Sequence, residues 1–166
     1  YKRQLYYSNH PDGRFLMREF CYAVAASFFG SLGFAVLFNT RGKRILISAV
    51  GGAVFWGLYL VFIHFVDNQY LGFFLSAILI TIYAEVWARI LKTPATTVLM
   101  PTVIPFIPGG ALYYAVSAAL RMDLPVFAEK ARSALGLAVA LAAGIMVVTS
   151  LRGPVDLILR RWKQGS

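Results

Sequence analysis

The chain has 166 residues, of which 59% are hydrophobic and only 14% are charged, and its mean hydropathy is +0.68. Soluble domains are about 45–50% apolar and about 25% charged, so this composition excludes an ordinary water-soluble domain and indicates a membrane protein. The net charge of +9 does not indicate nucleic-acid binding, because the cations lie in short breaks between apolar runs and in the tail, as they do near lipid headgroups. We therefore expect contact with membrane lipid and no nucleic-acid partner.

Five apolar runs follow a polar, basic N-terminal segment at residues 1–19. A helix needs about 20 apolar residues to cross the hydrocarbon core of a bilayer. The sequence therefore predicts an all-α integral membrane protein, a bundle of about five transmembrane helices within residues 20–151. The predicted helices are 20–38, 45–66, 70–91, 97–120 and 134–151.

The first run, 20–38, is uncharged and ends at Asn39, ahead of a short break that contains three cations, Arg41, Lys43 and Arg44. An asparagine at this position can end the helix in the left-handed conformation, or its amide can line a cavity. Both interpretations remain open, and Asn39 is included among the candidate substrate-binding residues.

The third run, 70–91, contains Glu85, with Arg89 one helical turn later. Ionisable groups inside a membrane are costly, and they indicate a functional site. One interpretation is that Glu85 binds a substrate ammonium group or carries a coupling proton. The other is an i,i+4 pair with Arg89, which contributes little to stability.

The fourth run, 97–120, is interrupted by three prolines and two glycines. They are Pro101, Pro105, Pro108, Gly109 and Gly110. Each proline lacks an N–H group and leaves the carbonyl four residues earlier without its helical partner. The carbonyls concerned are those of Thr97, Pro101 and Ile104. Unsatisfied backbone groups cost several kcal/mol in hydrocarbon, so this run must face protein or a wet cavity, either as a broken span or as a re-entrant segment.

A helix that restarts after Gly110 has about ten residues and begins near mid-membrane. The free N–H groups at the start of this helix suit a carboxylate, and the freed carbonyls before the break suit an ammonium group. Together these two kinds of backbone group fit an amino-acid zwitterion. A kinked helix without a ligand is the alternative. The candidate substrate-binding residues are Pro105, Pro108, Gly109, Gly110, Tyr113 and Asn39, and the candidate proton or ammonium site is Glu85 with Arg89.

The tail, residues 152–166, pairs apolar with basic side chains and predicts a C-terminal amphipathic helix that lies at the membrane interface. If all five runs cross, the first connection, the third connection and the tail share one side and carry most of the cations. This side is then cytoplasmic. The basic segment 1–19 lies on the other side, against the same rule.

Small residues recur every four residues in four of the runs, a pattern typical of close helix packing in lipid. The stripes are Ala26-Gly30, Ser48-Gly52, Ala53-Gly57, Ala111-Ala115-Ala119 and Gly136-Ala140-Gly144. No catalytic or metal-ligating constellation is present, since the two histidines lie in unrelated segments and Cys21 is the single cysteine. We therefore predict no enzymatic activity, no metal and no cofactor.

Three elements occur together: Phe38-Asn39 at the end of the first helix, a second helix rich in small residues, and the run Ile104-Pro105-Phe106-Ile107-Pro108-Gly109 followed by Tyr113. This pattern resembles the threonine/serine exporter family, and most closely its small, separately encoded subunit. The resemblance covers roughly residues 20–151. It implies proton-driven export of small hydroxy amino acids across the inner membrane.

The resemblance also implies a half-transporter, which needs a larger subunit of the same family or further copies of itself. Two other functions remain open from the residues alone. One is export of a small carboxylate or dicarboxylate such as succinate, because the start of the predicted half-helix suits either cargo. The other is a membrane scaffold subunit that transports nothing, in which the broken run has a structural role only.

Overall fold

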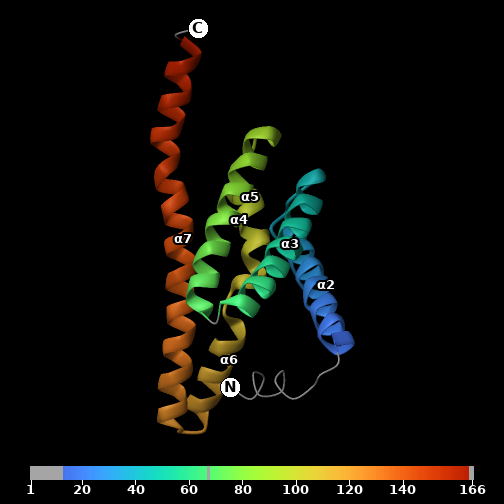
Figure 1. Cartoon of the computed structure of the whole chain (residues 1–166), viewed down its shortest axis with the longest axis vertical. Coiled ribbons are helices and arrows are strands. Elements are labelled where there is room, and N and C mark those ends of the chain that lie inside the picture. Colours follow the sequence, from blue (N-terminus) through green and yellow to red (C-terminus); the bar gives the residue numbers. More distant parts are fainter. Residues whose placement is uncertain (1–12, 67, 165–166) are drawn as a thin grey trace.

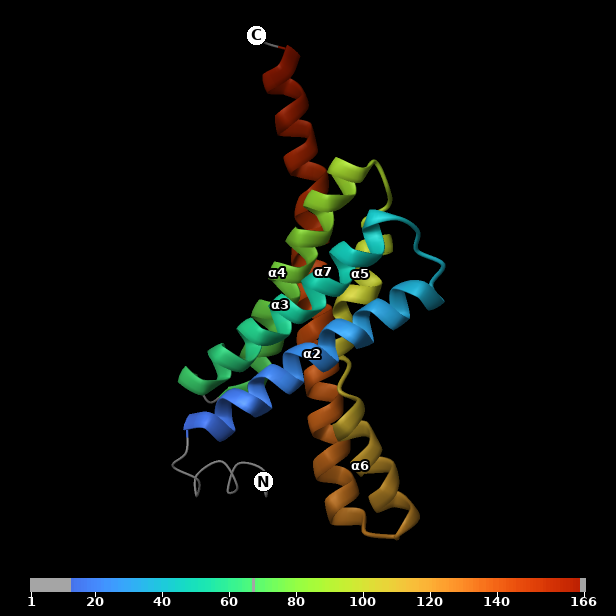
Figure 2. The same cartoon turned by 90° about the vertical axis from the view of Figure 1, so that its right-hand side faces the viewer.

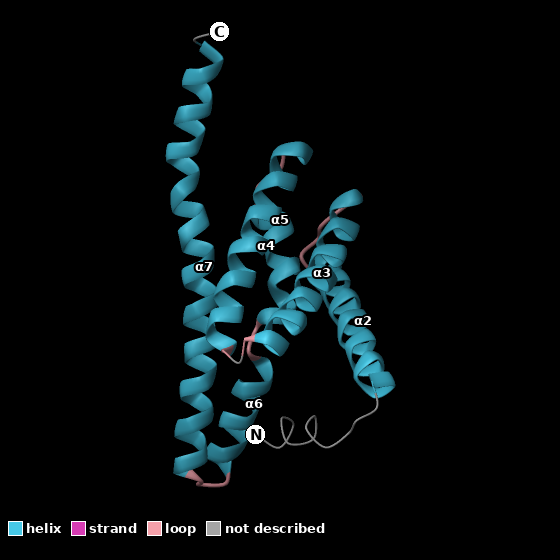
Figure 3. Ribbon diagram, in the orientation of Figure 1, coloured by secondary structure: helices cyan, strands magenta, loops and turns pink. Residues whose placement is uncertain are grey.

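The computed structural model describes the backbone of residues 13–66 and 68–164, and the side chains of residues 17–66 and 68–152. Every regular element in these ranges is a helix (Figure 3), which confirms the predicted all-α fold class. The elements are α2 (Gly13–Leu37), α3 (Lys43–Phe65), α4 (Gln69–Leu91), α5 (Thr96–Val103), the 3-10 helix η1 (Ile104–Phe106), α6 (Gly109–Leu120) and α7 (Leu124–Gln164).

Four of these helices, α2, α3, α4 and α7, are long and apolar enough to cross a membrane. A fifth span is formed if the bent pair, α5 with η1 and then α6, crosses as one unit. The bend between its two parts is 54°. The predicted bundle of about five helices, with a broken fourth, is therefore confirmed.

Three of the helices end in the same backbone motif, each with a non-glycine residue in the left-handed region. These residues are Asn39 (φ 54°), Lys92 (φ 51°) and Met122 (φ 59°). In each case the amide of the following residue donates to the carbonyl five positions earlier. The bonds are Thr40 to Ala35 (2.9 Å), Thr93 to Ala88 (3.0 Å) and Asp123 to Ala118 (3.0 Å). The motif satisfies carbonyls that a helix end otherwise leaves unpaired.

Helix α7 begins ten residues earlier than predicted, at Leu124 instead of residue 134. The carboxylate of Asp123 accepts a hydrogen bond from the Val126 amide (3.3 Å), which caps the first turn. Residues 128–132, Ala-Glu-Lys-Ala-Arg, include three charged side chains, but all five are strong helix formers. The prediction took their polarity for a link between helices.

Two further boundaries differ from those expected. Helix α2 begins at Gly13, inside the predicted polar segment 1–19, and α7 continues through the predicted separate tail helix as far as Gln164. Helix α7 has 41 residues, which corresponds to a length of about 61 Å. Side chains beyond Arg152 lie outside the described residues, so an interfacial position for the tail stays a prediction.

The helices form two parts, which are called here the bundle (α2 to α5 with η1) and the hairpin (α6 and α7). Within the bundle, α3 contacts α2, α4 and α5. Within the hairpin, α6 packs mainly against α7, and α7 meets the bundle through α4. Figures 1 and 2 both show the hairpin extending past the turn between α3 and α4. The same views place the α2–α3 turn, the α4–α5 turn and the C-terminus toward the opposite end, which is the arrangement that five crossings require.

Helices α4 and α7 run parallel and in close contact, with small residues between them. A Cβ atom added to Gly136 would lie 2.6 Å from the ring of Tyr70, and one added to Gly144 would lie 2.6 Å from the Cβ of Ala77. Backbones therefore approach closely here, as the Gly136-Ala140-Gly144 stripe predicts.

A second close crossing joins α2 to α3. Here the hydroxyl of Ser31 occupies the space that a side chain on Gly52 would fill. Beside it, the hydroxyls of Ser48 and Thr102 both contact the carbonyl of Val98, at 3.4 and 2.7 Å. All of these residues are buried, so the Ser48-Gly52 stripe also forms an interface, in which α5 takes part.

Candidate functional site

The chain changes direction at residues 105–110, which are called here the break. Helix α5 contains Pro101, and η1 follows it directly with Pro105 in its first turn. Ile107 is then extended (φ −66°, ψ 123°), and Pro108 precedes the first turn of α6. Two prolines and an extended residue therefore prevent α5 and α6 from forming one continuous helix.

The backbone hydrogen bonds of the break differ in one respect from those predicted. The carbonyl of Ile104 is not left without a partner, because it accepts the Ile107 amide at 3.1 Å. The tighter 3-10 turn makes this bond possible where an α-helical bond to Pro108 is not. The prolines at 101 and 105 still cannot donate to the carbonyls of Thr97 and Pro101.

The N-terminus of α6 presents two amides. Gly109 donates to the carbonyl of Ile107 (2.6 Å) and Leu112 to that of Pro108 (3.0 Å). The amides of Gly110 and Ala111, between them, have no acceptor among the described residues, and no side chain caps the helix. Uncapped amides at the positive end of a helix dipole favour an anionic group.

The face of the break around α6 is open in the single chain. Cβ atoms added at Gly109 and Gly110 would meet nothing within 4 Å. Tyr113 follows one turn later and is 69% exposed, with its ring 5.5 Å from that of Tyr114. The break was predicted to face protein or a wet cavity, and the described residues do not cover this face of it.

The opposite face of the break is held by aromatic packing. Phe106 is fully buried, and its ring lies 5.2 Å from that of Trp56, 5.8 Å from Tyr59 and 5.7 Å from Phe73. Edge-to-face contacts of this kind add to the free energy of burial. The break is therefore anchored on one side and open on the other.

These contacts also fix the level of the break along the bundle. Phe73 lies four residues after the start of α4, and Tyr59 lies six residues before the end of α3. The break is therefore close to the α3–α4 turn, and its predicted position near mid-membrane stays a prediction. The α6–α7 turn lies well beyond the α3–α4 turn (Figure 2), so α6 extends away from this level along the hairpin.

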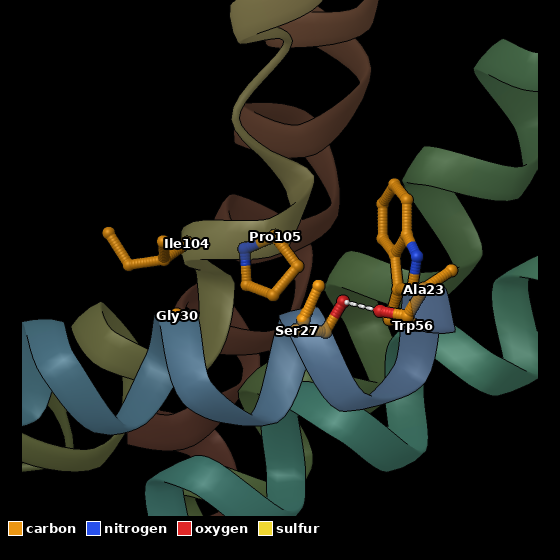
Figure 4. Close-up of a pocket in the computed structure, with 7 residues that line it drawn as sticks. Ala23, Ser27, Gly30, Trp56, Ile104 and Pro105 are labelled. Atoms are coloured by element: carbon orange, nitrogen blue, oxygen red, sulfur yellow. Dashed lines mark hydrogen bonds between the residues drawn. The ribbon is translucent and has the colours of Figure 1, made fainter. Parts of the chain in front are cut away.

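A groove lies beside the break, between α2 and η1. Its volume is about 360 Å³, and its lining is almost entirely apolar. The lining residues are Ala23, Ala26, Ser27, Gly30, Trp56, Ile104 and Pro105. Figure 4 shows the hydroxyl of Ser27 turned back to the carbonyl of Ala23 (2.8 Å) rather than offered to the groove. Of the predicted site residues only Pro105 lines it, and its surface does not suit a zwitterion.

Glu85 lies near the other end of α4 and is 9% exposed. Its Oε1 accepts a hydrogen bond from Nη1 of Arg152, on α7, at 3.2 Å, while Oε2 is buried without a hydrogen-bond partner among the described atoms. The sequence singled out Glu85 but not Arg152. Their pairing depends on the register of α4 against α7, which no local pattern gives.

The predicted site residues do not form one cluster. Glu85 is twelve residues after Phe73, which contacts the break, so the two places are about 18 Å apart along α4. Arg89 lies one turn beyond Glu85 and is exposed. Asn39 ends α2 in the left-handed conformation, and its amide oxygen accepts a bond from Nε of Arg41 (3.4 Å). Capping, rather than lining a cavity, is the role that this geometry supports.

Residues 23–151 match the family described as "Threonine/Serine exporter, ThrE". The matched range contains α3 to α6, most of α2 and the apolar part of α7, with both the break and Glu85 inside it. The chain belongs to the threonine/serine exporter family. No solved structure matches the chain. Membership establishes an exporter-type membrane transporter, in agreement with the resemblance noted in the sequence.

Proposed function

We propose that this threonine/serine exporter chain is one subunit of a proton-coupled secondary transporter that exports threonine and serine across the inner membrane. The observation that carries the proposal is the break, where the N-terminus of α6 has two uncapped amides on a face that the described residues leave open. In this proposal the Gly110 and Ala111 amides bind the substrate carboxylate. Pro105, Pro108 and Gly109 shape the backbone around it.

Tyr113 offers a hydroxyl within one turn of those amides and is the proposed partner of the substrate hydroxyl or ammonium group. The open side of the break supports an assembly of more than one chain, because exposed polar backbone is unfavourable against lipid. The covering element is proposed to come from a larger subunit of the family or from a second copy of this chain.

Glu85 is proposed to carry the coupling proton, with Arg89 as a nearby cation at the same end of α4. Two observations support this role: the Glu85 carboxylate lies within the apolar helix α4, and its buried Oε2 lacks a hydrogen-bond partner among the described residues. Such groups mark proton or ion pathways in transporters. In this proposal the proton and the substrate therefore use different sites, about 18 Å apart along α4.

Flux in reconstituted vesicles tests the function. We expect vesicles that contain this chain, with its genomic neighbour where that encodes the larger subunit, to carry labelled threonine and serine faster than empty vesicles. A pH gradient is expected to increase the flux. Transport of succinate in place of both amino acids would favour the carboxylate cargo, and no flux of any of the three would favour the scaffold function.

The same vesicles test the role of Glu85. Flux through the Glu85→Gln variant is expected to lose its response to the pH gradient, because the amide cannot exchange a proton. The matched control is Glu129→Gln, which removes an exposed carboxylate from α7. An unchanged pH response in Glu85→Gln would contradict the proton role and leave the cargo assignment intact.

A further inference from the structure

Two main connections join the described parts of the bundle and the hairpin. The chain itself passes from one to the other at the break, and α7 packs against α4. The connection through the chain contains no continuous helix, since Ile107 is extended between η1 and α6. Extended and glycine-containing connections are where helical domains usually change orientation.

The α4–α7 contact has a regular register. Gly136 faces Tyr70, Gly144 faces Ala77, and Arg152 faces Glu85, so the offset between the two helices is 66 or 67 residues throughout. The contact extends from Gly136 to Arg152 on α7, a rise of about 24 Å. Its first two layers consist of small and aromatic side chains, a surface over which packed helices can shift by small steps.

The Glu85–Arg152 pair lies at the end of this contact farthest from the break. Glu85 is almost completely buried, whereas the side chain of Arg152 is about half exposed. A buried carboxylate that loses its counter-ion is strongly disfavoured. The side chain of Arg152 also contacts water, so the pair can open without burying an unpaired guanidinium group.

We propose that the hairpin rocks against the bundle about residues Ile107 to Gly110, and that the Glu85–Arg152 ion pair holds the two parts together in the conformation described here. The pair acts as a latch at one end of α7, and the break acts as the hinge near the level of the α3–α4 turn. The role of this motion in transport rests on the proposed function, but the motion itself does not.

Distances between spin labels test the latch. Labels are placed at Leu46 on α3 and Leu151 on α7, both exposed, in a Cys21→Ser background that removes the single cysteine. In lipid nanodiscs, double electron–electron resonance is expected to give one main distance for the parent protein. Arg152→Gln and Glu85→Gln are each expected to add a second, longer distance. The same single distance in both variants would overturn the proposal.

Two further variants separate a latch from general loss of folding. Exchanging the charges, with Glu85→Arg and Arg152→Glu together, is expected to restore the single distance. The control Glu129→Gln breaks an ion pair within α7, between Glu129 and Lys130, and is expected to leave the distance unchanged. The latch would be contradicted by a second distance in the Glu129→Gln control. It would also be contradicted if the second distance persisted in the charge-exchanged protein.

The hinge is tested in the Arg152→Gln variant by adding Gly109→Ala and Gly110→Ala. Neither glycine has a positive φ and a Cβ meets nothing at either position, so the fold tolerates both changes. We expect the second distance to lose amplitude, because alanine restricts the backbone. An undiminished second distance would place the hinge elsewhere.

The outcomes also distinguish this inference from the proposed function. The labels report motion without substrate or gradient. Distances that respond to the latch in a protein that carries no threonine would refute transport and leave the latch standing. Threonine flux through a protein whose label distances do not change in the latch variants would refute the latch and leave the transport function intact.

Discussion

Replacing Gly109 and Gly110 together by leucine is expected to abolish threonine and serine flux while the protein remains folded. A Cβ atom added at either position meets no described atom within 4 Å, so the larger side chains are expected to be tolerated by the fold. They fill the region in front of the Gly110 and Ala111 amides, where the substrate carboxylate is proposed to bind. Loss of these contacts is expected to reduce flux to the level of empty vesicles.

The matched control for this change is Gly33→Leu. Gly33 lies on α2 and is exposed, and a Cβ atom added there likewise meets nothing within 4 Å. Flux through the control is expected to equal that of the parent protein, and size-exclusion chromatography in detergent checks that both variants fold. Normal flux through the Gly109 and Gly110 variant would remove the break from the substrate site.

Removing Arg152 alone is expected to destabilise the protein more than removing both members of its ion pair. Arg152→Gln leaves the buried carboxylate of Glu85 without this counter-ion. Breaking a fully buried ion pair costs about 3–5 kcal/mol of stability, whereas an exposed pair contributes at most about 1 kcal/mol. Because the Arg152 side of this pair is half exposed, we expect the free energy of unfolding to fall by about 1–3 kcal/mol.

The comparison with the double variant makes this prediction specific. Glu85→Gln combined with Arg152→Gln removes the buried charge as well, and its midpoint of thermal unfolding is expected to lie above that of Arg152→Gln alone. Glu129→Gln is expected to change the midpoint little, because its pair with Lys130 is exposed. Equal losses in the single and double variants would show that Glu85 is not held as a buried charge by Arg152.

The number and approximate positions of the helices were predictable because the membrane imposes a simple length rule on apolar runs. The Pro-Gly interruption was predictable for the same local reason, since proline removes a donor wherever it stands. The Gly136-Ala140-Gly144 stripe correctly indicated an interface, although its partner, α4, could not be named from spacing alone.

The features that were missed depend on contacts between distant segments. Arg152 is 67 residues from Glu85, and only the parallel register of α4 and α7 brings them together. The level of the break depends on Phe106 packing against Phe73, a contact that apolar run lengths do not specify. Asn39 was open to two interpretations because an asparagine at a helix end suits both a C-cap and a binding site. Its left-handed backbone conformation supports the C-cap.

Residues 124–133 lie outside the predicted helix 134–151, because their charge was taken as evidence for a link. In the structure they form the first turns of α7, which the Asp123 side chain caps. In a helix that extends past its neighbours, charged side chains remain exposed and carry little cost. Polarity therefore marks the end of the apolar region here, and not the end of the helix.

Protection of a thiol at the break tests the central claim most directly. The Gly110→Cys variant in the Cys21→Ser background is treated with a membrane-impermeant maleimide, with and without threonine, and Gly33→Cys serves as the control. Threonine is expected to slow labelling at position 110, where it binds, and to have no effect at position 33. Labelling at position 110 that proceeds at the same rate with and without threonine, in vesicles that transport it, would contradict a substrate site at the break.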